Sequence, residues 1–244
     1  MRALSAPELL DVWERGNVQS PVHQALSLLS AACPEASADS LTKLNIGERD
    51  ARLLTLREWT FGSQLIGIAT CPDCRERLEL TFNVADIQMT PESGPTRELT
   101  IDVAGYDVRF RLPNSLDMDA IADHKDVDVA CEELLESCLL SVYHDGEEIS
   151  PDHLPAILVE AIVERMAEAD PGADVQLALS CPSCRHQWHV TFDIVSFFWS
   201  EINAWAYHRL HEVHALALAY GWREADILAM SPWRRQFYLE RVGG

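Results

Sequence analysis

Two short segments of the chain have nearly the same sequence, and each begins with a pair of cysteines. CPDCRERLELTF occupies residues 71–82, and CPSCRHQWHVTF occupies residues 181–192. Both cysteines, the proline between them, the arginine after them and the final Thr-Phe pair are identical. A Cys-x-x-Cys turn points two sulfurs at one centre, and the alternating apolar residues that follow are typical of a β-strand. We call residues 71–74 and 181–184 the two hooks.

Two hooks of this kind predict one metal site with four sulfur ligands. Zn²⁺ accepts four thiolates in a tetrahedron, and such a site is closed and structural. We therefore expect one structural Zn²⁺ per chain, and neither catalytic nor cofactor-binding residues. The predicted ligands are Cys71, Cys74, Cys181 and Cys184.

Other interpretations of the cysteine pairs are less favoured. A thiol-disulfide pair needs a reactive cysteine at the start of a helix, whereas each hook leads into a predicted strand. His186 and His189 lie close to the second hook and could replace a cysteine as ligand, but positions on the following strand are the simpler assignment. We expect the remaining cysteines, Cys33, Cys131 and Cys138, to be buried thiols.

Composition and charge limit the classes of partner. With 244 residues, of which 48% are hydrophobic, the chain can bury a proper core. The formal net charge of −20 repels nucleic-acid phosphates and anionic lipids. No apolar run reaches about 18 residues, and the N-terminus carries charges where a signal peptide is apolar. We expect no membrane contact and a location in the cytoplasm of the producing cell, where thiols stay reduced.

The order of the motifs predicts an α+β fold that is mostly helical, with a small zinc-ribbon-like antiparallel β element made by the hooks. About a hundred residues separate the hooks, so the segment between them is expected to return to its starting point. We predict an N-terminal helical segment (1–35), a zinc-ribbon-like core (36–90 and 173–195), an inserted hairpin with helices (91–172) and a C-terminal helical region (196–244).

Apolar periodicity places the individual elements. The main predicted helices lie at residues 48–59, 127–142, 154–167, 194–220, 223–230 and 233–242, and a hairpin lies at 98–112. Small polar residues at 36–39 predict a loop. The charged residues Glu48, Arg49, Asp50 and Arg52 are interpreted as a solvated helix start.

The C-terminal region contains two further patterns. His208, His211 and His214 recur every third residue, which spreads them over about 9 Å of helix axis, too far for one ion to bind all three. The last helix carries Arg234, Arg235 and Arg241, which suggest DNA binding, but three arginines are too few against a charge of −20. Its apolar residues, Trp233, Phe237, Tyr238 and Leu239, favour burial, and the tryptophans concentrated in this region fit a protein docking surface better than DNA binding.

Several segments together resemble the baseplate hub assembly proteins of T-even-type contractile phages and of related contractile injection systems. They are NIGERDARLLTLREWTFGSQL before the first hook, CPSCRHQW, FDIVSFFWSEI, and EVHALALAYGWREADILAMSPWRRQFYLERV. The resemblance covers about 35–85 and 170–242. It implies a non-enzymatic protein that contacts hub, spike or tape-measure proteins, either as an assembly chaperone or as a component of the particle.

Two other classes of function remain as alternatives. One is a zinc-ribbon regulator or another nucleic-acid-associated module, against which the acidity argues. The other is an enzyme, for which the sequence shows no nucleophile-base pair, phosphate loop or open metal site.

Overall fold

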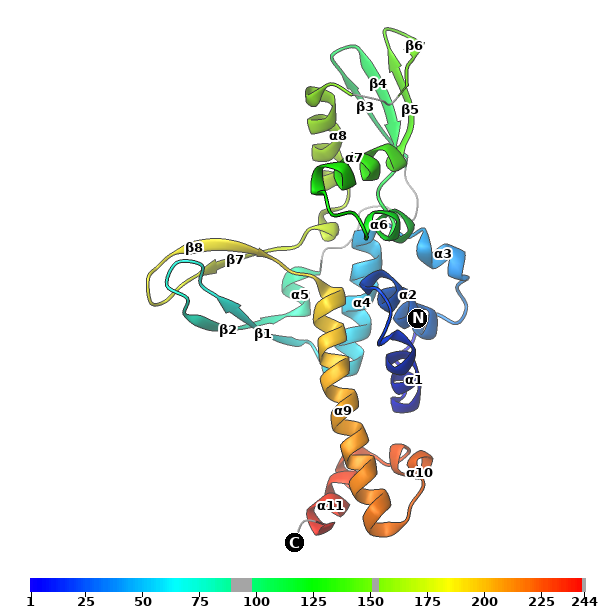
Figure 1. Cartoon of the computed structure of the whole chain (residues 1–244), viewed down its shortest axis with the longest axis vertical. Coiled ribbons are helices and arrows are strands. Elements are labelled where there is room, and N and C mark those ends of the chain that lie inside the picture. The colour runs from blue at the N-terminus through cyan, green and yellow to red at the C-terminus, as the bar shows by residue number, and fades with distance from the viewer. Residues whose placement is uncertain (89–97, 151–153, 243–244) are drawn as a thin grey trace. The chain divides into compact units, whose positions relative to one another are not determined.

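The computed structural model describes residues 1–88, 98–150 and 154–242 (Figure 1). Its helices and short antiparallel sheets confirm the predicted α+β class. The chain divides into two compact units: unit 1 comprises Met1–Glu35 and Ile194–Gly244, and unit 2 comprises Ala36–Asp193. The finer division into four segments stays a prediction, and its boundary at residue 91 lies outside the described residues.

Unit 1 is helical. It contains α1 (Ala6–Gly16), α2 (Pro21–Ala32), α9 (Ile194–Tyr220), α10 (Glu224–Leu228) and α11 (Pro232–Val242). The side chains of Ser5 and Glu8 form a capping box at the start of α1, and Ser20 caps α2. Gly221 follows α9 with a φ of +67°, a left-handed conformation that glycine adopts easily at a helix end.

The long helix α9 is the centre of unit 1. Helices α1 and α2 both pack against it. Phe198 and Ile202 of α9 are fully buried, and the indole N–H of Trp13 in α1 donates to Asn203 at 3.0 Å. Gly16 approaches α9 so closely that a Cβ there would lie 2.3 Å from the ring of Trp199. The long helix predicted at residues 194–220 therefore supplies the core of unit 1.

A buried ion pair helps to fix helix α11 to α9, beside an aromatic contact between Tyr238 and Tyr220. The one buried residue of α11 is Arg235, whose Nε donates to the Glu212 carboxylate at 2.9 Å. Arg235 also donates to the backbone carbonyl of Met230 at 2.9 Å. Arg209 and His208 contact the same carboxylate, so Glu212 is the point at which the two helices join.

We expect Arg235→Met to destabilise unit 1 by about 2 kcal/mol, because removing one partner leaves the buried Glu212 carboxylate with less compensation. Arg209 remains beside Glu212, so the loss is smaller than for a carboxylate left alone. Urea unfolding followed by circular dichroism measures the effect. Arg241→Met, a matched change at an exposed position of the same helix, is the control, and equal losses in the two variants would contradict the assigned role.

Unit 2 begins with two helices and a hairpin. Its first elements are α3 (Ala38–Thr42), α4 (Ile46–Phe61), β1 (Gln64–Thr70), β2 (Arg77–Asn83) and α5 (Val84–Ile87). Helix α3 begins within the predicted loop at 36–39, because Ser37 accepts a hydrogen bond from the Ser40 backbone N–H and starts a helical turn. The start of α4 is also less solvated than predicted. The Arg49 side chain is 8% exposed and pairs with Asp50 at 2.7 Å.

The segment between the hooks has its own sheet and core. Its elements are β3 (Leu99–Val103), β4 (Tyr106–Phe110), α6 (Ser115–Ile121), α7 (Val127–Cys138), β5 (Leu139–His144), β6 (Glu147–Glu148), α8 (Ala156–Ala169) and the 3₁₀ turn η1 (Pro171–Ala173). The strands form an antiparallel sheet in the order β3-β4-β5-β6. Helix α8 packs on this sheet and supplies Leu158 and Ile162 to a core that includes Phe110 and Val142.

The helix predicted at residues 127–142 is wrong in its last four residues. Helix α7 ends at Cys138, and the chain continues as β5, in which Val142 pairs with Val108 of β4. The helical spacing of apolar residues continues through this point, but pairing with β4 decides the conformation. Cys138 is buried as predicted, whereas Cys131 is exposed.

The end of this segment returns to the start of α4. The Asp170 carboxylate is 6% exposed and accepts a hydrogen bond of 3.0 Å from the backbone N–H of Gly47. Burial raises the pKa of Asp170, as does the charge of Glu48, while the Gly47 N–H lowers it. A Cβ at Gly47 would lie 1.9 Å from the Asp170 carboxylate and 3.0 Å from the Gly172 backbone, so glycine is required here.

Candidate metal centre

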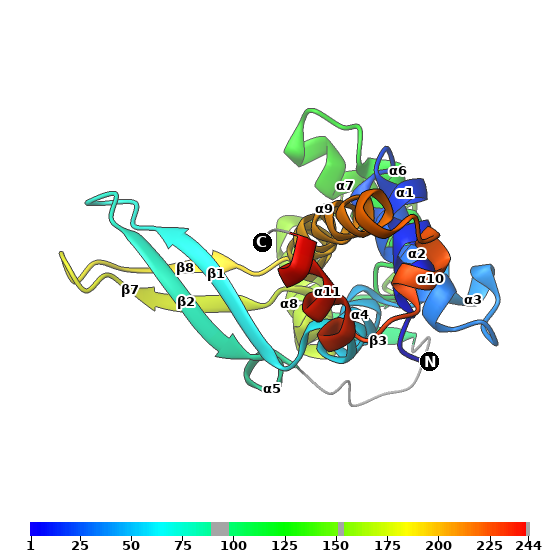
Figure 2. The same ribbon diagram turned by 90° about the horizontal axis from the view of Figure 1, so that it is seen from below.

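Two β-hairpins carry the hooks, as the sequence predicts. Strand β1 pairs with β2 in an antiparallel register from Gln64↔Asn83 to Thr70↔Arg77. The second hairpin consists of β7 (Gln176–Ser180) and β8 (Gln187–Thr191), paired from Gln176↔Thr191 to Ser180↔Gln187. Figures 1 and 2 show the hairpins side by side and crossing each other, with both turns at the same end. Each hook is the turn of its hairpin.

The two hooks have the same backbone geometry. In the first, the Cys71 N–H donates to the Glu76 carbonyl at 2.9 Å, and the Arg75 N–H donates to the Cys71 carbonyl at 3.0 Å. The corresponding bonds of the second hook, from Cys181 to His186 and from Arg185 to Cys181, measure 2.8 and 2.9 Å. The repeated sequence is therefore a repeated structure.

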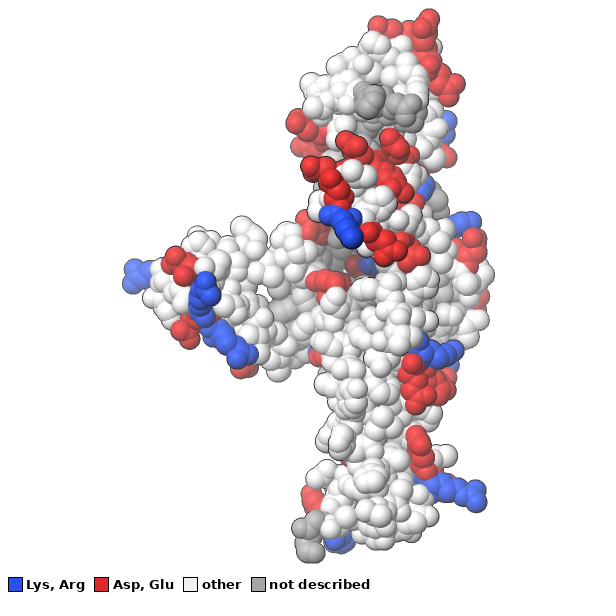
Figure 3. Space-filling model, in the orientation of Figure 1, with Lys and Arg blue, Asp and Glu red and all other residues white. Residues whose placement is uncertain are grey.

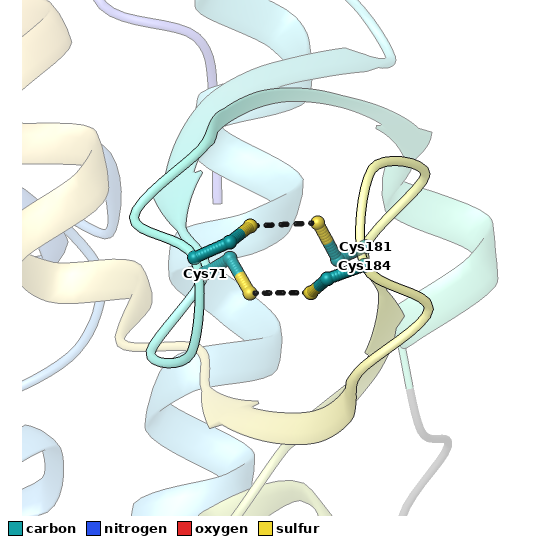
Figure 4. Close-up of side chains that lie close together, drawn as sticks. Cys71, Cys181 and Cys184 are labelled. Atoms are coloured by element: carbon teal, nitrogen blue, oxygen red, sulfur yellow. Dashed lines mark hydrogen bonds between the residues drawn. The ribbon is translucent and has the colours of Figure 1, made fainter.

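The hooks bring the four predicted ligands together (Figure 4). Cys71 Sγ lies 3.6 Å from Cys184 Sγ, and Cys74 Sγ lies 3.5 Å from Cys181 Sγ. All four sulfurs lie within 4.8 Å of one another. Zn–S bonds of about 2.3 Å in a tetrahedron place neighbouring sulfurs about 3.8 Å apart, so this arrangement matches the size of a zinc site.

The cysteines differ in their surroundings and in their pKa values. The backbone N–H groups of Cys184 and Ser183 lower the pKa of Cys181 to about 7. The His186 N–H lowers the pKa of Cys184, but loss of hydration and the three neighbouring sulfurs outweigh it and raise that pKa to about 12. The four sulfurs therefore differ in how readily they ionise. A divalent cation among them would favour the thiolate form of each.

His186 and His189 do not belong to the sulfur cluster. Within the described residues, the group of His, Cys, Asp and Glu side chains that could hold a metal ion consists of Cys71, Cys74, Cys181 and Cys184. The His186 ring instead stacks on Trp188, with 5.9 Å between the ring centres. His189 lies on β8, opposite Ala178 of β7.

Two features of the site were not predicted from the sequence, although the repeat contains signals for both. Arg75 and Arg185 have φ values of +63° and +64°, a left-handed conformation that favours glycine. Phe82 and Phe192, which end the two copies, meet edge to face with 5.6 Å between ring centres. Identity of these positions in the two copies is the signal for a shared structural role.

The C-terminal arginines do not form a joint phosphate-binding surface. Arg235 is 4% exposed and is neutralised by Glu212, so it is not available to a nucleic acid. The histidines of α9 make local contacts: His208 pairs with Glu212 at 3.0 Å, and His211 lies 2.7 Å from the Tyr207 carbonyl. These observations do not favour nucleic-acid binding.

Comparison with known proteins identifies the family. The family model described as T4 bacteriophage base plate protein matches residues 8–199. No curated protein and no solved structure gives a match. Among the described helices, none has the length and apolar character needed to cross a membrane. The match includes both hooks and the segment between them, and it stops before the C-terminal pattern that contributed to the resemblance. The chain belongs to the family of T4 bacteriophage base plate proteins.

Proposed function

We propose that this baseplate protein acts in assembly of the baseplate hub as a non-enzymatic scaffold, and that one structural Zn²⁺ bound by the two hooks holds it together. The family match supports a role in the phage tail baseplate. The observation that carries the zinc proposal is the convergence of four sulfurs on one point. The proposed ligands are Cys71, Cys74, Cys181 and Cys184.

The position of the hooks explains what the metal would do. The paired sulfurs are 107 and 113 residues apart in sequence, so one ion closes a very long loop. Closing a loop of about a hundred residues removes on the order of 4 to 5 kcal/mol of chain entropy from the unfolded state, by analogy with a disulfide. Four protein ligands also leave no open coordination position for a substrate. The metal would therefore stabilise the two hairpins as one rigid body.

The proposed partners are hub, spike or tape-measure proteins of the same particle, as the resemblance implies. The baseplate family implies contacts with other tail proteins. Over most of the surface, the net charge of −20 favours proteins with basic patches over nucleic acids, although a local pair of arginines can still bind an acidic segment. We propose incorporation in the particle, after synthesis in the cytoplasm of the producing bacterium. A zinc-ribbon regulator would instead show salt-sensitive DNA binding.

Deletion of the gene is expected to abolish complete baseplates, because a missing scaffold stops the steps that follow it. Electron microscopy of lysates measures this outcome, and a plasmid copy of the gene is the control. Antibody detection in purified tails then distinguishes a built-in component, which is present, from an assembly chaperone, which is absent. Normal tails from the deletion strain would contradict the proposed function.

A further inference from the structure

Helix α11 exposes an aromatic side and buries a charged residue, the reverse of an ordinary amphipathic helix. We expected Trp233 and Phe237 to be buried, but they are 78% and 38% exposed, while Arg235 is 4% exposed. Trp233, Phe237 and Arg241 recur every four residues, so they form one stripe along the helix. An apolar stripe normally faces the core. Here the side of α11 that contacts α9 carries a buried ion pair, and the aromatic stripe faces away from it.

The orientation of α11 is fixed by two sets of contacts. The Arg235–Glu212 pair holds one side of the helix against α9. Tyr238 lies edge to face against Trp222 and Tyr220, with ring centres 4.8 and 5.7 Å apart. Rotating the helix to bury Trp233 would expose the Arg235 side chain and break these contacts. The exposed stripe is therefore a consequence of the packing rather than of a loose helix end.

The exposed stripe is already ordered. The Trp233 and Phe237 rings stack with 6.0 Å between their centres. The Arg241 guanidinium lies over the Phe237 ring, 3.4 Å from the ring centre. It also donates a hydrogen bond to the Phe237 carbonyl at 2.9 Å. Stacking of this kind restricts side-chain motion before any partner arrives, which reduces the entropy lost on binding. Tryptophan, arginine and other aromatic residues are also the types enriched at the centres of protein interfaces.

The charges beside the stripe indicate the kind of partner. The chain has 39 acidic and 19 basic residues, so carboxylates are abundant. Nevertheless, in the described part of the chain, neither Arg234 nor Arg241 pairs with a carboxylate, although their neighbour Arg235 does. On the helix circumference both arginines lie on the same side of the Trp233–Phe237 pair. In Figure 3 most of the visible surface over α11 and the end of α9 is uncharged.

We propose that Trp233, Phe237, Arg234 and Arg241, which we call the α11 stripe, form a docking surface for an apolar segment of another baseplate protein that carries acidic residues along one side. Apolar side chains of that segment cover the two rings, and its carboxylates pair with the two guanidiniums. A second copy of this chain is disfavoured because each copy carries a charge of −20. The stripe lies beyond the residues that match the family model, 8–199, so the match does not imply this surface. The inference rests on the proposed role in the baseplate.

Site-specific photocrosslinking in the assembling particle tests this surface. p-Benzoylphenylalanine replaces Phe237 in the full-length chain, and the same probe replaces Val18 as the control, because Val18 is 93% exposed in unit 1 but lies on the loop between α1 and α2 rather than on α11. After irradiation of purified tails or trapped intermediates, mass spectrometry identifies the crosslinked peptide. We expect the probe at position 237 to label one segment of another particle protein that contains both apolar and acidic residues, and the probe at position 18 not to label it.

A second set of variants tests the chemistry of the contact. With the probe kept at position 237, Trp233→Ala and Arg241→Glu should each lower the crosslink yield at least about tenfold, as expected for interface hot spots. Both residues are exposed, so circular dichroism of the variants should be unchanged. A basic target segment, labelling of another copy of this chain, or equal labelling from position 18 would overturn the proposal. If the protein takes no part in the particle, the gene deletion leaves tails intact, which separates that failure from failure of this surface.

Discussion

Removal of the metal is expected to unfold the hook region of unit 2 and to lower the melting temperature sharply. Without the ion, the hooks at residues 71–74 and 181–184 are no longer joined, and the unfolded chain regains the freedom of a loop of about a hundred residues. The loss should reach at least about 4 kcal/mol from loop closure, since structural zinc binding contributes its free energy directly to folding. Incubation with a strong chelator, followed by thermal unfolding, measures this effect.

Cysteine variants make the same test specific. Elemental analysis should find about one zinc per chain in the wild type, and Cys71→Ser or Cys184→Ser should lose the zinc and most of the hook stability. Cys131→Ser is the matched control, because Cys131 is exposed and lies outside the sulfur cluster. It should keep its zinc and change stability by less than about 0.5 kcal/mol. A protein that contains no metal, and whose melting temperature is the same with and without the chelator, would show that the sulfur cluster is not a metal site.

Gly47→Ala is expected to destabilise unit 2 by at least about 2 kcal/mol, although alanine is the better helix former by about 1 kcal/mol. The added Cβ would lie 1.9 Å from the Asp170 carboxylate and 3.0 Å from the Gly172 backbone, so α4 and the turn after α8 would have to separate. The buried hydrogen bond between Gly47 and Asp170 would then be lost. Urea unfolding of the zinc-bound protein measures the change.

A double-mutant cycle identifies the cause of that effect. In an Asp170→Gly background the nearest clashing atoms are absent, so Gly47→Ala should cost clearly less than in the wild type. Additive losses would mean that the Asp170 carboxylate is not the obstacle. The result would also show how firmly the segment after α8 is tied to α4.

The sequence predicts the parts of this fold that have local signals. The repeated Cys-x-x-Cys motifs identified the four sulfurs that converge, and the apolar period with the glycine at residue 221 located the end of α9. The sequence repeat contains the same residue at positions 75 and 185 and at positions 82 and 192. Only the structure shows the reason, which is the left-handed backbone of Arg75 and Arg185 and the contact between the Phe82 and Phe192 rings.

Features decided by distant contacts were missed. The end of α7 depends on pairing between β4 and β5, which the helical period of the sequence does not contain. The exposure of Trp233 depends on the burial of Arg235 against Glu212, and an apolar pattern predicts the opposite orientation. The four sulfurs are compatible with a metal site. The identity of a partner for α11 depends on the sequence of another chain.

The equivalence of the two hooks has a consequence for how this protein can change during evolution. Each hook is complete within its own hairpin, so both halves of the cluster form locally, and the polypeptide between them serves as a tether. The stretch from β3 to α8 has an independent core, built on Leu99, Phe110 and Ile162. Such a stretch can lengthen, shorten or be exchanged for a different module while the sulfurs keep their places. Differences in length and sequence among relatives should therefore concentrate between the two hairpins. New binding surfaces can arise there without disturbing the sulfur cluster.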